Sequence, residues 1–264
     1  MELKKGILIF CAVITLSGAN AQILTGPMLG GQATMAGYSS QYDGVDFRQD
    51  FSFNYLGGWS YAYSVSDYVS FYSELVYSRK GKVQRYSSPS TRIVNHRAHN
   101  NFLDAPVMLR VSIPMGRSKA RWFINLGPQI SYWLGGRGTV TAYEFFGSTN
   151  LIDIDYRVSF SESAPAEGIL AVEGANRLQF GLAIGTGFRV PVNRKGQEVV
   201  INFRYVSGTT NLGGNESVEI STEGIDEYLG FKYNALQVSA VYAFPVDVFG
   251  LRRGKSSQKV KHRK

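Results

Sequence analysis

Side chains that form covalent or metal cross-links are scarce in this sequence. Among 264 residues there are one cysteine, three histidines and eight prolines. A single cysteine cannot form an intramolecular disulfide, and there are no matched cysteine and histidine pairs for a structural zinc site. The chain also has no run of about 20 apolar residues, which excludes an ordinary membrane-spanning helix.

The first 21 residues have the pattern of a cleavable signal peptide (residues 1–21). Lys4 and Lys5 form a positive n-region, an apolar stretch of about ten residues follows, and Ala19-Asn20-Ala21 is an A-x-A cleavage site. Such a stretch is too short to serve as an anchor helix. We therefore expect export and a mature chain that begins at Gln22. The only cysteine leaves with the leader, so no disulfide, thiol nucleophile or lipid anchor remains.

Hydrophobicity alternates with a period of two through the rest of the chain. Between Ala235 and Phe244, bulky apolar residues stand at every second position. The 29 glycines, 16 tyrosines and 16 phenylalanines suit curved strands and aromatic girdles. Eight strands are predicted, at residues 27–37, 51–65, 68–83, 101–114, 120–134, 176–190, 197–210 and 231–244. The predicted fold is all-β: an eight-stranded, antiparallel, up-and-down transmembrane β-barrel of the outer-membrane type, in residues 22–245.

The connections between these strands alternate between short and long. Ser66-Asp67, residues 115–119 and residues 191–196 are short, whereas the connections near 38–50, 84–100, 135–175 and 211–230 are long. Periplasmic turns and longer external loops give this alternation in bacterial outer-membrane barrels. The pattern predicts the bacterial outer membrane as the location, with both termini in the periplasm. A soluble sandwich or lipocalin-type barrel also alternates in hydrophobicity, but does not need such regular asymmetry.

The two faces of each predicted strand differ in polarity. The residues predicted to face lipid are Val69, Phe71, Leu75, Tyr77, Leu103, Val107, Leu109, Val111, Ile113, Leu178, Phe180, Leu182, Ile184 and Phe188. The opposite face is polar or small and contains Gln32, Asn54, Glu74, Asp104, Arg110, Asn125, Gln129, Gln179, Arg189, Asn202, Arg204 and Gln237. This second set is predicted to line the lumen.

Five ionisable residues of the lumen form a candidate polar network: Glu74, Asp104, Arg110, Arg189 and Arg204. If Val83 pairs with Asn101, Glu74 lies opposite Arg110, with Arg204 at a similar depth across the lumen. Ionisable groups at membrane depth are candidates for a proton or ion pathway. An eight-stranded barrel, however, has an interior that side chains can fill, which favours a closed lumen.

The net charge of +8 is concentrated at the end of the chain. The leader carries +1, from two lysines against one glutamate, and the segment after Phe244 carries +6, from seven bases against Asp247. Only +1 remains for the barrel. The bases of the predicted periplasmic tail (residues 246–264) are Arg252, Arg253, Lys255, Lys259, Lys261, Arg263 and Lys264. This tail is either a disordered segment or a tether to lipid head groups, peptidoglycan or an acidic periplasmic partner protein. Nucleic acid is not an expected partner.

Charges in the predicted external loops are segregated. The stretch after the third strand contains Arg79, Lys80, Lys82, Arg85, Arg92 and Arg97 without an acid, whereas the third and fourth loops are acidic. These loops either dock on one another, bind lipopolysaccharide phosphates and divalent cations, or are simply solvated. Residues 139–145 and 151–160 also alternate, which predicts a hairpin that extends beyond the membrane.

Catalytic and cofactor-binding patterns are weak. The candidates are His96 and His99 in the second external loop, with Asp104 below them. Proximity in sequence supplies neither a positioned base nor an orienting partner, and the spacing of the two histidines is a weak metal signal. No phosphate-binding Gly-Lys-Ser/Thr loop follows a strand. We therefore predict no enzyme activity, no cofactor and no metal.

Four segments resemble a known family. They are Phe71-Tyr72-Ser73-Glu74-Leu75-Val76-Tyr77-Ser78-Arg79-Lys80-Gly81, Phe102-Leu103-Asp104-Ala105-Pro106-Val107-Met108-Leu109-Arg110, Asn125-Leu126-Gly127-Pro128-Gln129-Ile130-Ser131-Tyr132 and Gly185-Thr186-Gly187-Phe188. Together they are similar to the PorT-like outer-membrane β-barrel family of Bacteroidota. Ser73 stands where that family usually has Pro, and Asp104-Ala105 where it has Glu-Ile. The resemblance implies an integral outer-membrane barrel without a defined activity, and one member of the family is linked to type IX secretion.

The predicted function is a non-enzymatic outer-membrane barrel that serves as a structural or interaction scaffold. It would be an accessory subunit of a secretion or envelope-assembly complex, in contact with outer-membrane lipid and lipopolysaccharide. The alternatives are a narrow channel, a surface adhesin and, more remotely, a lipid A-modifying enzyme.

Overall fold

The structure is a computed structural model that describes residues 22–38, 47–87, 92–116, 119–160, 168–172, 175–193, 196–213, 217–221 and 225–246. The predicted signal peptide lies outside these ranges, as do the tail bases from Arg252 to Lys264 and the acids Glu162, Glu167, Glu173, Glu216 and Glu223. No helix in the described part of the chain is long and apolar enough to cross a membrane.

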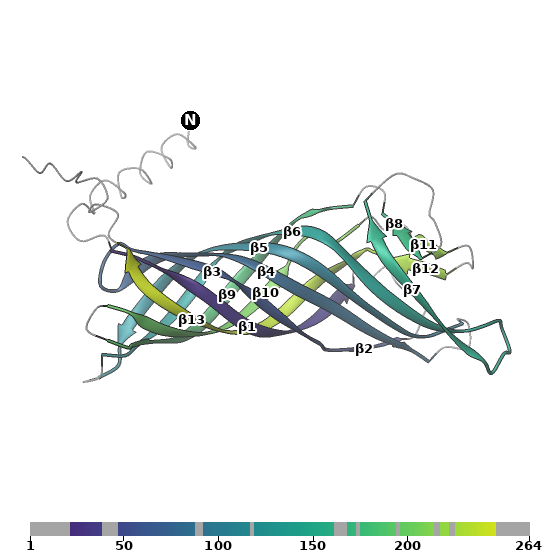
Figure 1. Cartoon of the computed structure of the whole chain (residues 1–264), viewed down its shortest axis with the longest axis horizontal. Helices are drawn as coiled ribbons and strands as arrows, with labels where there is room; N and C mark the ends of the chain where they lie inside the picture. The colour runs from purple at the N-terminus through teal and green to yellow at the C-terminus, as the bar shows by residue number, and fades with distance from the viewer. Residues whose placement is uncertain are drawn as a thin grey trace, which may run out of the picture.

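Eight antiparallel strands close into a ring (Figure 1). The ring strands are β1 (Gln22–Tyr38), β3 (Ser52–Ser64), β4 (Val69–Tyr86), β5 (Ile93–Pro114), β6 (Arg121–Tyr143), β9 (Leu178–Pro191), β10 (Glu198–Gly208) and β13 (Phe231–Val246). β1 pairs with both β3 and β13, so the first and last ring strands are neighbours. Closure pairs the backbone groups along both sides of every ring strand, as a bilayer requires. The predicted eight-stranded up-and-down barrel is confirmed.

Five shorter strands lie outside the ring: β2 (Phe47–Asp50), β7 (Leu151–Ser159), β8 (Ile169–Ala171), β11 (Ser217–Ser221) and β12 (Ile225–Tyr228). β2 pairs with β4, β7 with β6, and β8 with β7, whereas β11 and β12 form a separate hairpin. Figure 1 shows most of these strands at one end of the barrel, which we call the long-loop end. The described ends of the chain, near Ile23 and Val246, pair at the opposite, short-turn end.

One predicted connection is mostly strand. Residues 84–100 were expected to form a long loop, but β4 continues to Tyr86 and β5 begins at Ile93. The ladder between them reaches Arg85 and Asn95, and each added pair satisfies backbone groups without help from solvent. This hairpin therefore projects well past the apolar part of the wall, and its connecting loop is short.

The turn also comes earlier in the chain than predicted, and this changes the register between β4 and β5. Val83 pairs with Arg97 rather than with Asn101, and Arg110 pairs with Ser70. Glu74 therefore does not lie opposite Arg110, and that predicted neighbour relation is wrong. The position of the turn fixes the register of a hairpin, and the prediction placed this turn too late along the chain.

The predicted faces are confirmed. Every residue predicted to face lipid is on the outer side, and apolar residues dominate that side of β5 from Leu103 to Ile113. This stretch has the length of about 10 residues that a tilted strand needs to cross a bilayer. The predicted lumen residues are buried, apart from the half-buried Asn54.

Two apolar clusters fill the inside of the barrel. One lies in the membrane part of the wall and includes Met28, Leu56 and Met108. The other joins the ring to β7 and β8 at the long-loop end, and its members include Phe102, Trp133, Val140, Tyr156, Leu170, Leu212, Phe231 and Tyr233. The second cluster closes the long-loop end of the barrel with packed aromatic rings.

Gly187 allows a close approach inside the barrel, and its replacement supplies a test of the packing. A Cβ atom at Gly187 would lie 2.0 Å from the carbonyl oxygen of Ile201 and 2.6 Å from the ring of Phe123. We expect G187A to lower the free energy of unfolding by about 1–3 kcal/mol, because the backbone must shift. Urea unfolding in lipid vesicles measures this change.

G31A is the matched control for that substitution. The nearest heavy atom to a Cβ at Gly31 is 3.7 Å away, which is ordinary contact. Equal stability of the two variants would contradict the steric explanation.

Candidate functional site

An ion pair crosses the centre of the lumen. Arg204 of β10 donates two hydrogen bonds to the carboxylate of Glu74 on β4, with lengths of 2.7 and 2.5 Å. The Tyr72 hydroxyl donates a third, 2.5 Å long, to the same carboxylate. Because β4 and β10 are four positions apart in a ring of eight, this contact joins opposite walls. All three side chains are buried. Each charge has lost its hydrating water and is stabilised by its partner instead.

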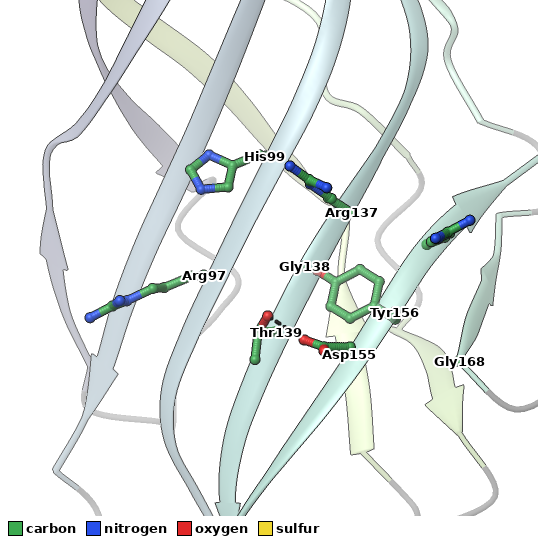
Figure 2. A pocket seen from close by; sticks show the side chains of 9 residues that line it. Arg97, His99, Arg137, Gly138, Thr139, Asp155, Tyr156 and Gly168 are labelled. Carbon is green, nitrogen blue, oxygen red and sulfur yellow. Dashed lines mark hydrogen bonds between the residues drawn. The ribbon is translucent and has the colours of Figure 1, made fainter.

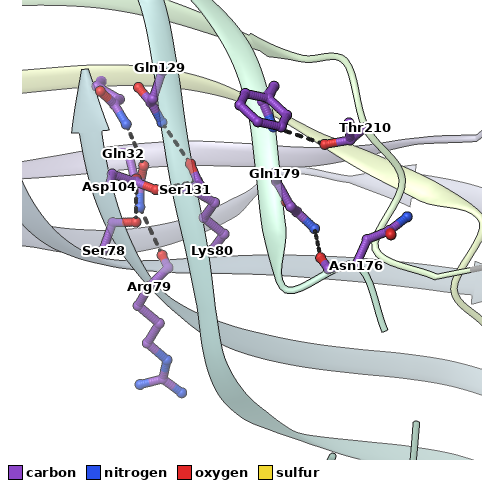
Figure 3. A network of polar contacts seen from close by, with 12 residues as sticks. Gln32, Ser78, Arg79, Lys80, Asp104, Gln129, Ser131, Asn176, Gln179 and Thr210 are labelled. Carbon is purple, nitrogen blue, oxygen red and sulfur yellow. Dashed lines mark hydrogen bonds and ion pairs between the residues drawn. The ribbon is translucent and has the colours of Figure 1, made fainter. Parts of the chain in front are cut away.

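A second ion pair lies one layer nearer the long-loop end. Lys80 donates to Asp104 at 2.9 Å, and Ser78 donates to the other carboxylate oxygen at 2.7 Å. Lys80 also donates to Ser131 at 3.3 Å and lies 4.4 Å from the centre of the Phe102 ring. Figure 3 shows Ser78, Asp104, Lys80 and Ser131 brought together from three strands. Asp104 therefore has a partner that was not predicted for it.

Lys80 and Lys82 are not part of the exposed basic stretch to which they were predicted to belong. Both lie within the predicted third strand, at inward positions of β4, and both are buried. Lys82 lies 4.7 Å from the Phe231 ring and donates to the Tyr38 hydroxyl at 3.4 Å. The even-numbered positions of this strand all point inward, and this parity was the signal that could have identified both lysines.

Arg110 has no carboxylate partner among the described residues. Its guanidinium lies 3.5 Å from the centre of the Tyr72 ring and 4.1 Å from that of Phe123. Two of its nitrogen atoms, Nε and Nη2, make no hydrogen bond within the described part of the chain. Contacts with the ring faces stabilise this charge, because the face of an aromatic ring is electronegative.

Arg189 forms a third ion pair, near the short-turn end. It donates to the two carboxylate oxygens of Glu198 at 2.8 and 3.2 Å, and reaches the Ser112 hydroxyl at 3.5 Å. Glu198 was not predicted as a site residue, because it is the first residue of β10 and its direction depends on the turn. The five predicted lumen residues thus lie in one barrel interior, but in separate layers rather than in one network.

Among the described residues, the interior around the central ion pair is closely packed. A space of about 10 Å³ lies beside Glu74, Asp104 and Arg204, which is room for about one water molecule. The aromatic cluster lies nearer the long-loop end and closes that end of the barrel. Side chains therefore occupy the lumen, as the narrow ring of eight strands favours.

The three predicted catalytic candidates do not converge. His96 is buried and its Nε2 lies 2.7 Å from the Tyr156 hydroxyl, whereas His99 points to the outer wall. Asp104 is buried with Lys80. An odd spacing places the two histidines on opposite faces of β5, so their rings do not form a pair. The described residues hold no group of three or more His, Cys, Asp and Glu side chains that could bind a metal ion.

The predicted hairpin is present as β6 and β7. The predicted fifth strand extends to Tyr143 as β6, whereas β7 is a separate strand and is not a continuation of β9, the predicted sixth strand. Within the hairpin, β6 pairs with β7 from Arg137 to Tyr143. Thr139 and Thr141 donate to Asp155 and Asp153 across it, each at 2.6 Å. The tip exposes Phe145 and Phe146, with 59% and 69% of their surfaces accessible. Large apolar side chains at an exposed tip are a contact surface rather than a core.

The strands form a closed ring, the outer side of the ring is apolar, and its inner side carries polar side chains. These three features define an outer-membrane β-barrel. Residues 20–214 match the family model described as "Outer membrane protein beta-barrel domain". The chain belongs to this family. No curated protein matches the sequence.

Solved structures with the same kind of fold are only distantly similar. Neisserial surface protein A is 13% identical, with 86% of this chain and 99% of that chain covered and a TM-score of 0.37. Ail, the attachment invasion locus protein of Yersinia pestis, is 10% identical, with 84% and 98% covered and a TM-score of 0.33. The family assignment depends on the family model alone.

The central ion pair makes a specific prediction about stability. We expect E74Q to lower the free energy of unfolding by about 3–5 kcal/mol, because Arg204 would remain buried without a counter-charge. The double variant E74Q/R204M removes both charges and should recover most of that loss. Urea unfolding in lipid vesicles gives the three free energies. D50N serves as the control, since the Asp50 to Arg85 ion pair is exposed to solvent. A double variant that is no more stable than E74Q would contradict this explanation.

The burial of His96 predicts that the stability of the long-loop end depends on pH. Burial, together with the charge of Lys82, holds the pKa of His96 well below its ordinary value. The unfolded end binds a proton below about pH 6.5 and the folded end does not, so stability is complete above that pH and declines as the pH falls. Protease resistance of the β6–β7 hairpin between pH 7 and 5 measures this decline.

H96Q is the informative variant for the pH effect, since it removes the titrating ring. It should flatten the profile, while H99Q on the outer wall should leave most of the decline intact. An unchanged slope in H96Q would contradict the assignment.

Proposed function

We propose that this protein is a closed, non-enzymatic scaffold of the bacterial outer membrane whose long-loop end binds a partner protein. The short-turn end and both termini then lie in the periplasm, and the β6–β7 hairpin projects outward. Short periplasmic turns and long external loops support this orientation. The chain would thus be held in place by its barrel and would act through the surface that it presents.

The observation that carries the proposal is the filled interior combined with an exposed apolar tip. Ion pairs and aromatic rings occupy the lumen, which argues against a narrow channel. The separation of His96, His99 and Asp104 argues against a lipid A-modifying enzyme that uses these residues. Phe145 and Phe146 at the hairpin tip remain as a surface suited to binding.

A surface adhesin is the second candidate, and the same tip favours it. A projecting hairpin with two exposed phenylalanines would bind a host or neighbouring-cell protein as readily as a subunit of the same envelope. The two candidates differ in where the partner is found, not in the surface that binds it.

We also propose that the chain is a PorT-like member of the barrel family and an accessory subunit of a secretion or envelope-assembly complex. The segments that carry the resemblance fall on β4, β5, β6 and β9, and they include Glu74, Asp104 and Arg110 of the interior. The basic tail, from Arg252 to Lys264, would bind a periplasmic partner or peptidoglycan by its charge.

Cross-linking on intact cells followed by mild-detergent purification tests the scaffold. We expect F145S/F146S to lose a partner that the unaltered protein captures, because the tip supplies the buried apolar contact. Y68S is the matched control: Tyr68 is 58% exposed but lies at the short-turn end. A third variant, truncated after Val246, tests the tail separately.

Folding of every variant is checked by heat-modifiable gel mobility, and planar bilayers test the channel alternative. The purified barrel should give no steady conductance. Stable single-channel currents, or capture that is indifferent to the tip and to the tail, would contradict the scaffold proposal.

A further inference from the structure

Five basic side chains gather on the outer wall of the barrel near the long-loop end. They are Arg79 of β4, Arg97 and His99 of β5, Arg137 of β6 and Arg157 of β7. We call this set the basic wall patch. His99 pairs directly with Arg137, and Arg137 pairs directly with Arg157, so three bases stand side by side on neighbouring strands. Figure 2 shows Arg97, His99 and Arg137 around one pocket.

A β-bulge turns Arg137 toward the outside. Phe102 pairs with Trp133 but Asn101 pairs with Gly135, so β6 has one extra residue at this point. Trp133 and Val140 both point inward although they are seven positions apart, which an uninterrupted strand does not allow. Without the bulge, Arg137 would point into the lumen. Bulges re-aim side chains in this way and occur often beside functional sites.

The charges of the basic wall patch are not neutralised within the described residues. None of the four arginines makes an ion pair there, and the one acid beside them, Asp155, accepts a hydrogen bond from Thr139. Burial and the charges of Arg79, Arg137 and Arg97 lower the pKa of His99. Like charges directly opposite each other destabilise a sheet, and a bound anion would reverse that effect.

The patch lies where the head groups of a bilayer would be. Tyr77, Leu103, Tyr132 and Leu178 form one row of outward residues on four neighbouring strands. Arg79 is two residues farther along β4 than Tyr77, a distance of about 7 Å along the strand. Aromatic rings mark the membrane interface in barrels of this type, so the bases begin just outside the apolar layer.

Two neighbouring hollows lie at the basic wall patch. The first has a volume of about 420 Å³, and its lining contains Arg97, His99, Arg137 and Arg157 together with one acid, Asp155. The second, of about 260 Å³, shares His99, Arg137 and Arg157 and adds Arg79 with the stacked rings of Tyr55 and Tyr77. The first hollow is lined mainly by bases, and the second lies between bases and an aromatic pair. Their volumes are close to those of pockets that hold small ligands.

We propose that the basic wall patch binds the phosphorylated sugar head group of an outer-leaflet glycolipid of the lipid A class. Arginine side chains bind phosphate oxygens through paired hydrogen bonds, and the hollow beside Tyr55 and Tyr77 accepts the sugar and the start of the acyl chains. An exterior wall site adjoining the apolar band suits a lipid in the bilayer better than a soluble anion. The lipid assignment rests on the proposed orientation, in which the long-loop end is external.

Binding of defined lipids to the purified full chain tests the proposal. The probes are diphosphorylated lipid A, its dephosphorylated counterpart, phosphatidylglycerol and inorganic phosphate, and the number of bound molecules is followed by native mass spectrometry in detergent. We expect diphosphorylated lipid A to bind about tenfold or more tightly than the dephosphorylated form, as charge-assisted hydrogen bonds of this strength require. Equal binding of the two forms would overturn the proposal.

Paired arginine substitutions locate the site. R137Q/R157Q should weaken binding of diphosphorylated lipid A by about tenfold or more, and R137K/R157K should lose less because it keeps the charges. The control R48Q/R85Q removes the same charge from an exposed pair near Asp50 and should change binding by less than about twofold. Equal effects of R137Q/R157Q and the control would overturn the assignment, and the lysine variant keeps the test valid if the glutamine variant does not fold.

The remaining outcomes separate the source of the anion and the orientation of the barrel. Displacement of lipid A by inorganic phosphate at equal concentration would show a free-anion site and overturn the lipid proposal, as would equal affinity for phosphatidylglycerol. Labelling of the β6–β7 hairpin on intact cells tests orientation alone. Binding by the purified chain with no labelling from outside would reject the outer-leaflet lipid while leaving the anion site itself established.

Discussion

Closure of eight strands into one ring is the constraint on which the rest of this structure depends. In hydrocarbon, every backbone N–H and C=O group must find a partner within the protein, and a closed ring leaves no unpaired edge. The pairing of β1 with β13 completes the ring. A ring of eight is narrow, so closure also determines that the inward side chains meet across the lumen. The described inward side chains therefore pack against one another as a core.

The polar content of that core follows from the same geometry. Glu74 and Arg204 reach each other because their strands lie on opposite walls, and Lys80 reaches Asp104 across neighbouring strands. Buried charges of this kind are costly when single and tolerable when paired. Arg110 meets the same requirement differently, between two aromatic rings. Charges inside the barrel thus stabilise one arrangement of the walls, while apolar residues cover the outer face of the wall and the hairpin tip is exposed.

Side-chain direction was predictable wherever alternation ran without interruption. The lipid-facing side of β5 and the inward positions of β9 follow from the period of two, because successive residues of a strand point to opposite faces. The same rule applied to Lys80 and Lys82, yet their charge suggested a loop. Alternation could not predict the direction of Arg137. The bulge at Gly135 reverses which positions of β6 point inward, and this bulge is defined only by the pairing with β5. Two members of the basic wall patch therefore differ. The outward direction of Arg79 follows from alternation, and that of Arg137 does not.

By itself, the sequence determined the class of fold, the number of ring strands and the face on which most side chains lie. These properties are local, because they depend on the spacing of residues along a single strand. Only the tertiary structure decided which charges pair, where β4 and β5 lie in register, and which bases share the outer wall. Those properties depend on contacts between strands that are far apart in the chain, as Glu74 and Arg204 are. Pairing across the ring, and not the pattern within a strand, places such residues together.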